Sequence, residues 1–405
     1  MSAPLIQPFT AIRPAPGRAQ DIIARPYDVL SSAEAVAGAR DRPWSFLHVS
    51  RAEVDLPVGT DVHAPEVYDR AAKAFAAMQA EGVLVRDPAS HYYTYRMIAA
   101  DGHVQTGVAA AASTRAYETN HIRRHEHTRP DKELDRARQI AAVGAHTGPV
   151  LTAHPGDREV DALLAAATGA VPMADAVTDD RTRHQVWPIV DPDDIDRLTA
   201  RFEAMPAIYI ADGHHRSAAA LRVAAQSGGR FLIISFPAEE MQILGYNRIV
   251  RDLNGRSPDG FLAEVAQASE VTPSSEPVSP ARPGSFGLYL PGQWYALSLR
   301  EPPAAGVSAV DRLDVSILMA RILTPILGIV DPRTDARIDF VGGGRGLADL
   351  ARRVDDDGWA VAFSLHPTAM ADLMAVADAG AVMPPKSTWF EPKLADGLLS
   401  LPIER

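Results

Sequence analysis

The chain has 405 residues and carries 40 Lys and Arg against 51 Asp and Glu, a formal charge of −11 at pH 7. It contains no cysteine, which excludes disulfides, thiolate nucleophiles, zinc–cysteine sites and cysteine-ligated iron–sulfur clusters. The acidic balance argues against a protein that wraps nucleic acid over a broad face, because such binding is largely neutralisation of phosphates by Lys and Arg.

Length and local breaks predict the domain organisation. At roughly 100–200 residues per domain, the chain should hold two or three domains, and the turn-rich stretch 254–258 marks a boundary. We expect an N-terminal α/β region over 1–255 and a C-terminal α/β region over 256–405. The N-terminus lacks a basic segment followed by an apolar one, and the apolar stretch 315–330 is interrupted by charge and proline. These features predict a cytoplasmic protein with no membrane partner.

The first hundred residues begin with turns and then alternate helix and strand signals. Ser31 and Glu34 form a capping-box pattern, which predicts that a helix begins after Ser31. Apolar residues at helical spacing predict a helix over 64–82. Aromatic residues predict a strand over 91–98, and an Asp-Gly pair predicts a hairpin turn into a second strand over 104–111.

The middle of the chain holds the clearest local pattern. A polar, histidine-rich loop leads into a helix near 132–139. Further along, an apolar strand over 207–211 precedes Asp212 and a glycine, a helix is predicted over 218–226, and a strand follows over 231–236. Strand, helix and strand in succession indicate an α/β unit. The C-terminal region is predicted to hold strands at 286–290 and 294–299, a helix from 310, and a strand–helix unit over 360–377.

The strongest candidate site lies at the junction of that strand and helix. A helix N-terminus favours an anion through its free N–H groups and its dipole, and glycine lets a ligand approach the backbone closely. Histidine and arginine side chains there would complete a cradle for phosphate. The candidate phosphate- or nucleotide-binding residues are Asp212, Gly213, His214, His215, Arg216 and Ser217. The alternative is an Asp N-cap with two His on a solvated first turn.

A second constellation lies in the histidine-rich loop. His125 and His127 with Glu126 allow a metal site, but the arginines around them would repel a divalent cation and suit phosphate instead. We favour a polar active-site loop over a metal site; a solvated charged loop is the third possibility. Neighbouring cations would keep Glu126 ionised and suited to general-base work. The candidate substrate-binding residues are Tyr27, His125, His127, Thr128 and Arg136.

Two smaller signals complete the set. Pro26 would fix Tyr27 and Asp28 in a rigid turn, and the alternative is a purely structural turn. Near the C-terminus, Lys386, Ser387 and Thr388 place a cation and two hydroxyls after a double proline. This segment lacks the glycines of a Walker A loop, so it is either a further phosphate-binding segment or a docking strand.

Taken together, the segments IQPFTAIRP, RPYDVLS, HEHT, ADGHHR and MPPKSTWFEPKL resemble the bacterial and archaeal domain of unknown function family 1015, over nearly the whole chain. The ADGHHR element is in turn similar to the phosphate-binding signature of the ParB and sulfiredoxin superfamily, which includes nucleotide-dependent free serine kinases. The resemblance implies an α+β fold, with a ParB/sulfiredoxin-like phosphate-binding core embedded in a larger two-domain α/β protein. Where the family pattern leads us to expect a His-Arg pair, this chain has Asn247 and Arg248.

The resemblance implies that His214, His215 and Arg216 bind phosphates, and that Glu126 or Asp28 is the acid–base residue, with His215 as a further catalytic candidate and Arg248 as a phosphate ligand. The leading function is a kinase that transfers phosphate from ATP or ADP to a small hydroxylated metabolite such as serine. Mg²⁺ would be carried by the nucleotide, with Asp212 or Asp28 as ligand.

Two alternatives accompany this hypothesis. A phosphatase of a phosphorylated metabolite such as phosphoserine uses the same groups with water as acceptor. A ParB-like nucleotide-binding regulator of DNA would need a basic helix-turn-helix downstream, where the chain is instead proline-rich and of mixed charge. We further expect the segment 121–136 to converge with 214–216 on one pocket, Glu126 to be preferred to Asp28 as the base, and Arg216→Ala to leave folding nearly unchanged.

Overall fold

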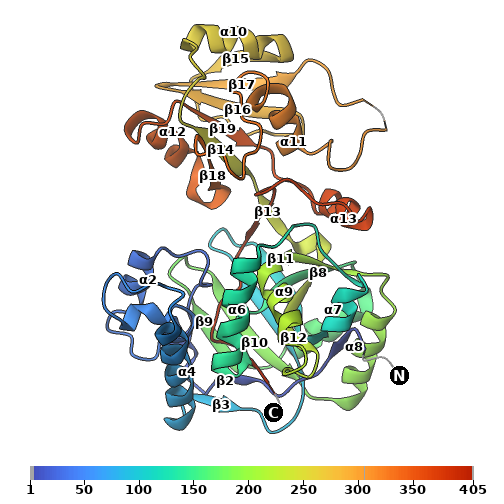
Figure 1. The fold of residues 1–405 in the computed structure, drawn as a ribbon. Helices are drawn as coiled ribbons and strands as arrows, with labels where there is room; N and C mark the ends of the chain where they lie inside the picture. Colours follow the sequence, from blue (N-terminus) through green and yellow to red (C-terminus); the bar gives the residue numbers. More distant parts are fainter. Residues whose placement is uncertain (1–3, 305, 404–405) are drawn as a thin grey trace. The chain divides into compact units, whose positions relative to one another are not determined.

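The computed structural model describes residues 4–304 and 306–403, which form two compact units of mixed α/β structure (Figure 1). The first unit comprises the chain up to Met241 together with the segment from Pro392 onward, and the second comprises Gln242–Glu391. In the described ranges, no helix is both long and apolar enough to cross a membrane.

The first unit is built on a nine-stranded sheet. Its strands follow the order β6 (Ile122–Arg123), β11 (Ile208–Asp212), β8 (Val150–His154), β12 (Arg230–Pro237), β5 (Val104–Ser113), β4 (Tyr92–Ile98), β10 (Arg183–Ile189) and β9 (Ala174–Val177), with β1 (Ile6–Gln7) beside β5. Two short pairs accompany it: β2 (Ile12–Pro14) with β3 (Leu84–Arg86), and β7 (Ala145–His146) with β21 (Leu401–Pro402). The predicted hairpin of β4 and β5 is confirmed.

The helices of this unit begin where the sequence offers caps or an initial proline. The Ser31 capping box is present, with Glu34 reaching back to the Ser31 N–H, and the helix predicted over 64–82 is α4. The helices are α1 (Ala19–Ile22), α2 (Ser32–Ala39), α3 (Leu47–Ser50), α4 (Pro65–Ala80), α5 (Thr114–Glu118), α6 (Pro130–Val143), α7 (Arg158–Ala167), α8 (Pro192–Glu203) and α9 (His214–Arg222).

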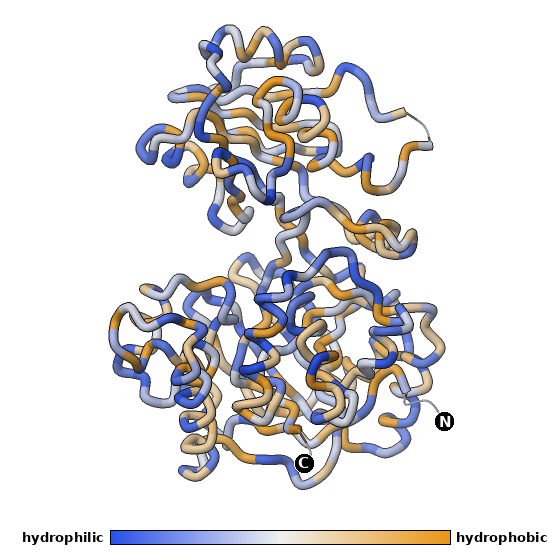
Figure 2. Tube along the Cα trace, viewed as in Figure 1, coloured by the Kyte–Doolittle hydropathy of each residue, from blue (hydrophilic) through white to orange (hydrophobic). Residues whose placement is uncertain are grey.

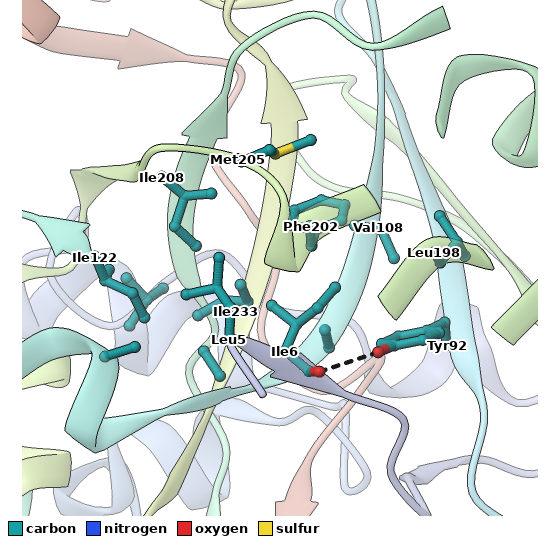
Figure 3. Packing of buried hydrophobic residues seen from close by; sticks show 14 of the residues in the cluster. Leu5, Ile6, Tyr92, Val108, Ile122, Leu198, Phe202, Met205, Ile208 and Ile233 are labelled. Carbon is teal, nitrogen blue, oxygen red and sulfur yellow. Dashed lines mark hydrogen bonds between the residues drawn. The ribbon is translucent and has the colours of Figure 1, made fainter. Parts of the chain in front are cut away.

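The core of the first unit lies between the sheet and its covering helices. Side chains from β1, β5, β11 and β12 pack against α7 and α8, and Figure 3 shows Leu198 and Phe202 beside Val108 and Ile233. The Tyr92 hydroxyl donates to the Ile6 carbonyl at 3.2 Å, which ties the N-terminal strand to the sheet. Figure 2 colours the chain by hydropathy: hydrophobic stretches lie in the interior of each unit, and hydrophilic stretches lie along loops.

The local prediction around α9 is wrong in two respects. The helix begins at His214 rather than Ala218 and ends at Arg222, because Gly213 adopts a positive φ directly after the strand ends at Asp212 and serves as the N-cap. The flanking strands do not form a parallel α/β unit: β8 lies between them, antiparallel to β11 and parallel to β12. A register shift between Ile210 and Asp212 also interrupts β11 beside the helix start.

The second unit holds a six-stranded sheet in the order β15 (Ser269–Ser274), β17 (Gln293–Leu299), β16 (Ser285–Leu290), β19 (Val361–Leu365), β14 (Tyr246–Val250) and β18 (Ile338–Gly342). A two-stranded sheet pairs β13 (Gln242–Leu244) with β20 (Trp389–Glu391), and the helices are α10 (Pro258–Ala268), α11 (Asp314–Leu318), α12 (Gly346–Asp356) and α13 (Met370–Asp378). The apolar face of α12 covers this sheet through Leu350 and Val354.

The division of the chain differs from the expected boundary after residue 255. The strand β14 belongs to the six-stranded sheet of the second unit, and this unit begins at Gln242, before the expected boundary. The last residues instead return to the first unit, where Leu401 pairs with His146. The helix expected from Val310 begins at Asp314.

Candidate active site

The candidate site of the first unit forms around the N-terminus of α9. Gly213 is the N-cap residue with φ of 98°, and no side chain caps the first turn, so its N–H groups are left for a ligand or water. A Cβ at position 213 would lie 3.0 Å from the Nε and Cζ atoms of Arg216. Glycine is therefore required both by the backbone conformation and by the close approach of the arginine.

Arg216 is buried and lies between two carboxylates. Its Nη2 atom is 3.8 Å from Asp212 Oδ2 and 3.9 Å from Asp28 Oδ2, and its Nη1 atom donates to the Pro149 carbonyl. Burial alone would lower its pKa, but Asp28 and Asp212 outweigh burial and raise the pKa. The Nε atom of Arg216 is buried without a hydrogen-bond partner. Arg216 is thus a permanent cation with one donor still unsatisfied.

Asp212 is held by a residue that sequence reasoning missed. Lys393, from the segment that returns to the first unit, places its Nζ atom 3.3 Å from Asp212 Oδ2. Burial acts to raise the pKa of Asp212, but Lys393 and Arg216 together lower the pKa well below its usual range. Asp212 is therefore ionised at all ordinary pH values and is neutralised by two cations.

Two histidines form the opposite edge of the site. The rings of His125 and His214 meet edge to face with centroids 4.5 Å apart, and Glu126 Oε2 lies 3.7 Å from His214 Nδ1. Burial lowers the pKa of His125 to about 4. Burial also lowers the pKa of His214, and the neighbouring His125 lowers it further. Both imidazoles are therefore neutral near pH 7. The atoms His125 Nδ1 and His214 Nε2 are buried without partners.

The structure brings the two sequence-predicted segments together, as expected. Glu126 and His125 contact α9 as above, and the backbone N–H of Arg129 donates to His215 Nε2 at 3.1 Å. Helices α6 and α9 lie side by side, with Ala137 and Ile140 of α6 packed on Ala219 of α9 (Figure 1). His125 and His214 are neutral near pH 7 and add no positive charge beside Glu126, so the predicted effect of cations on Glu126 depends on the arginines of its loop and stays a prediction.

Two predicted ligands have other structural roles. The Ser217 hydroxyl donates to the His214 carbonyl at 2.9 Å, and the Thr128 hydroxyl donates to Glu133. Each hydroxyl has a single proton, so neither can also donate to a phosphate in this arrangement. These two side chains form local bonds within their own segments, a common use of Ser and Thr beside a helix end. The predicted ligand His127 is exposed.

The turn that carries Tyr27 and Asp28 is fixed on both sides. The Arg136 guanidinium lies 4.1 Å from the centroid of the Tyr27 ring, and Arg51 donates to the carbonyls of Tyr27 and Leu30. Arg136 is also paired with Asp135 at 2.7 Å. The Asp28 side chain is 38 % exposed and lies beside Arg216. Its backbone is fixed by the hydrogen bonds that Arg51 makes on either side of it.

A small cavity adjoins this turn. Its volume is about 30 Å³, and its lining includes Tyr27, Arg136, Thr147, Arg216 and Asp396. A cavity of this size is large enough for one water molecule. Asp396, a second residue missed from the sequence, is buried, and burial raises its pKa to about 7 even though Arg216 opposes the shift.

The raised pKa of Asp396 predicts a distinct pH dependence of stability. Between its unfolded pKa of about 3.9 and its folded pKa of about 7, the folded protein holds a proton that the unfolded chain has released, so this group's contribution to stability falls as pH rises. Asp396→Asn removes the titration. Between pH 5 and pH 7 the parent should lose about 2–3 kcal/mol more stability than the variant. Urea unfolding at several pH values measures this; identical pH profiles for the two proteins would show that Asp396 does not titrate there.

The remaining predicted ligands lie in the second unit. Arg248 is on β14, and Lys386, Ser387 and Thr388 precede β20. The Ser387 hydroxyl donates to the Pro384 carbonyl at 2.6 Å and is not available as a phosphate donor. The predicted part of these four residues in phosphate binding stays a prediction.

The carboxylates of the site were compared with the needs of a magnesium ion. Mg²⁺ in nucleotide sites is held by one or two carboxylates together with phosphates and water. Asp212 does not fit this role, because its carboxylate is already neutralised by ion pairs with Lys393 and Arg216. In the described part of the chain, no three His, Asp or Glu side chains form a group suited to a metal ion.

Comparisons with known proteins place the chain in a sequence family. The sequence model described as "Protein of unknown function (DUF1015)" matches residues 6–316. The matched range confirms the resemblance but ends before the closing MPPKSTWFEPKL segment, so the likeness covers less of the chain than expected. No curated protein matches the sequence.

Several solved structures resemble the fold. A conserved hypothetical protein from Pyrococcus furiosus is 14% identical with a TM-score of 0.35, covering 74% of this chain and 95% of the other. A free serine kinase in complex with AMP is 14% identical with a TM-score of 0.38, covering 74% and 91%. A C-terminally truncated SbnI from Staphylococcus aureus is 11% identical with a TM-score of 0.37, covering 73% and 87%. At these TM-scores the likenesses assign neither activity nor ligand to this chain.

Proposed function

We propose, for a chain that belongs to the DUF1015 family, a nucleotide-dependent phosphotransferase that acts on the hydroxyl group of a small metabolite such as serine. The observation that carries the proposal is the set of buried, unsatisfied nitrogens at the start of α9. His214 Nε2 and Arg216 Nε have no partner in the structure, and they lie beside first-turn N–H groups that no side chain caps. Buried polar atoms without partners are costly, so a ligand that satisfies several at once is favoured.

The charge and geometry of these groups favour a phosphate ligand. Arg216 stays cationic, and helix dipole and N–H groups add partial positive charge at the same point. His214 is neutral, so one of its ring nitrogens can donate a hydrogen bond without adding a second charge. Phosphoryl transfer needs mainly positioning and charge stabilisation, which such fixed donors provide. A nucleoside di- or triphosphate is the proposed donor.

The structure favours Asp28 over Glu126 as the proton acceptor, which reverses the preference drawn from sequence. The backbone around Asp28 is clamped by Arg51 on both sides, and a general base must be well positioned. Glu126 was preferred for its arginine-rich loop; the His214 imidazole, 3.7 Å from its Oε2 atom, is neutral and adds no positive charge.

The proposed reaction has a simple balance. The acceptor hydroxyl oxygen forms a bond to the terminal phosphorus, the bond from that phosphorus to the nucleotide oxygen breaks, and the hydroxyl proton passes to the Asp28 carboxylate. Arg216 and the first turn of α9 stabilise the negative charge on the transferred group. Asp212 and Lys393 hold the turn in place through their ion pair.

A transfer assay tests this proposal with the full chain. The protein is incubated with γ-labelled ATP or β-labelled ADP and a panel of hydroxy amino acids, and the phosphorylated acceptor and free phosphate are quantified separately. The proposal predicts acceptor-dependent transfer of label. Release of phosphate from phosphoserine without any transfer would instead identify a phosphatase. Absence of both activities, together with absence of nucleotide binding, would refute the proposal.

A further inference from the structure

The second unit contains a buried arginine outside the site described above. Arg248 on β14 is 4 % exposed. Its Nη1 atom donates to the Tyr246 carbonyl and its Nη2 atom donates to the Pro385 carbonyl at 3.3 Å. Carbonyl oxygens satisfy donors but do not neutralise a charge. The guanidinium has five N–H donors, so these two bonds leave most of its capacity unused.

Aromatic rings and a second cation surround this arginine. The Arg248 guanidinium lies 4.7 Å from the Phe340 ring centroid and 5.8 Å from that of Tyr246, and Lys386 Nζ lies 5.8 Å from the Tyr246 centroid. Trp389 packs edge to face on Tyr246 at 5.3 Å. Two cations therefore lie against the same aromatic ring, and like charges close together disfavour each other.

No carboxylate forms an ion pair with Arg248 among residues 4–304 and 306–403; the partners the structure gives it are the two carbonyls and the two rings. Glu391, near in sequence to this cluster, accepts from Trp389 Nε1 at 2.8 Å. Burial lowers the pKa of Arg248 to about 9. A buried cation without an anion is strongly unfavourable, so an arginine kept in this position calls for a reason beyond folding.

We propose that Arg248 and Lys386, framed by Tyr246 and Phe340, form a second anion-binding site that takes the phosphate or carboxylate group of a small molecule. The bound oxyanion supplies the missing counter-charge, accepts from the unused N–H groups of Arg248 and pairs with Lys386. The aromatic rings exclude water and strengthen the ion pair. All four of these residues belong to the second unit, and anion binding by them does not require the proposed transfer reaction.

Local hydrogen exchange in the full-length protein tests the proposal. Inorganic phosphate should increase the protection of peptides that cover β14 and residues 383–391, and acetate should do so if the site prefers carboxylate. Sodium chloride at equal ionic strength is the control. Protection by either oxyanion beyond chloride supports the site and identifies its preferred ligand. Protection equal to that with chloride, or none, would overturn it.

Two variants separate ligand binding from a structural role. Arg248→Met keeps the length and apolar stem of the side chain but removes the charge, and Lys386→Gln removes the charge of an exposed side chain. Each should weaken phosphate binding at β14 about tenfold to a hundredfold. Without phosphate, Arg248→Met should be as stable as the parent or more stable, because the unneutralised charge is gone. If Arg248→Met unfolded and Lys386→Gln bound phosphate as the parent does, Arg248 would have only a structural role.

Discussion

Asp28→Asn is expected to lower the rate of phosphoryl transfer about 10²–10⁴-fold while nucleotide affinity changes little, because the amide keeps the shape of the side chain and cannot accept the proton. Single-turnover transfer and equilibrium nucleotide binding, measured on the same preparation, separate the two effects. The charge of Arg216 remains in this variant, and Asp212 still faces it at 3.8 Å, so the cradle itself should persist.

Glu126→Gln is the matched control for that experiment, since it makes the same chemical change on the other side of the α9 turn. It should transfer phosphate at nearly the parental rate. If Glu126→Gln lost turnover and Asp28→Asn retained it, the base would be Glu126, in agreement with the preference drawn from sequence and against the one drawn from the clamped backbone of Asp28.

Arg216→Ala is expected to destabilise the folded protein by about 3 kcal/mol, because it leaves the Asp212 carboxylate without one of its two cations and the Pro149 carbonyl without its donor. Removing one partner of a buried ion pair costs more than the pair contributes, since the remaining charge stays desolvated. The sequence alone predicted little change in folding; the burial of Arg216 is the reason for the revision. Urea unfolding measures the free energy.

Arg216→Lys distinguishes charge from hydrogen-bond geometry in that experiment. The lysine retains a cation near Asp28 and Asp212 but lacks the planar fork of donors. It should recover much of the lost stability while binding nucleotide weakly. Parental stability in Arg216→Ala would contradict the structural role of this arginine, and parental nucleotide affinity in both variants would contradict its role in the cradle.

Short-range signals were sufficient for much of the fold. The Ser31 capping box, the β4–β5 hairpin and the start of α4 at Pro65 each depend on residues within a few positions of one another, and each is confirmed. The start of α9 was missed because its N-cap is a glycine with no polar side chain to signal it. The antiparallel relation of β11 and β12 depends on β8, which a local strand–helix–strand pattern does not reveal.

The candidate site was predicted in part for the same reason. Histidines and arginines adjacent in sequence pointed to the α9 turn, and convergence with Glu126 followed from the need to gather charge on one ligand. Lys393 and Asp396 were missed because the C-terminal segment returns to the first unit, a long-range event that leaves no local pattern. Composition also does not reveal that a hydroxyl such as that of Ser217 already donates its one proton to a nearby carbonyl.

The central claim is that the first turn of α9 holds the phosphates of a nucleotide. A crystal structure of the full chain grown with ADP tests it most directly. The account predicts a phosphate oxygen within hydrogen-bond distance of Arg216 and of first-turn N–H groups of α9, with the Asp28 carboxylate facing the terminal phosphate. An ADP molecule whose phosphates bind away from α9, with His214 Nε2 and Arg216 Nε still unsatisfied, would contradict it.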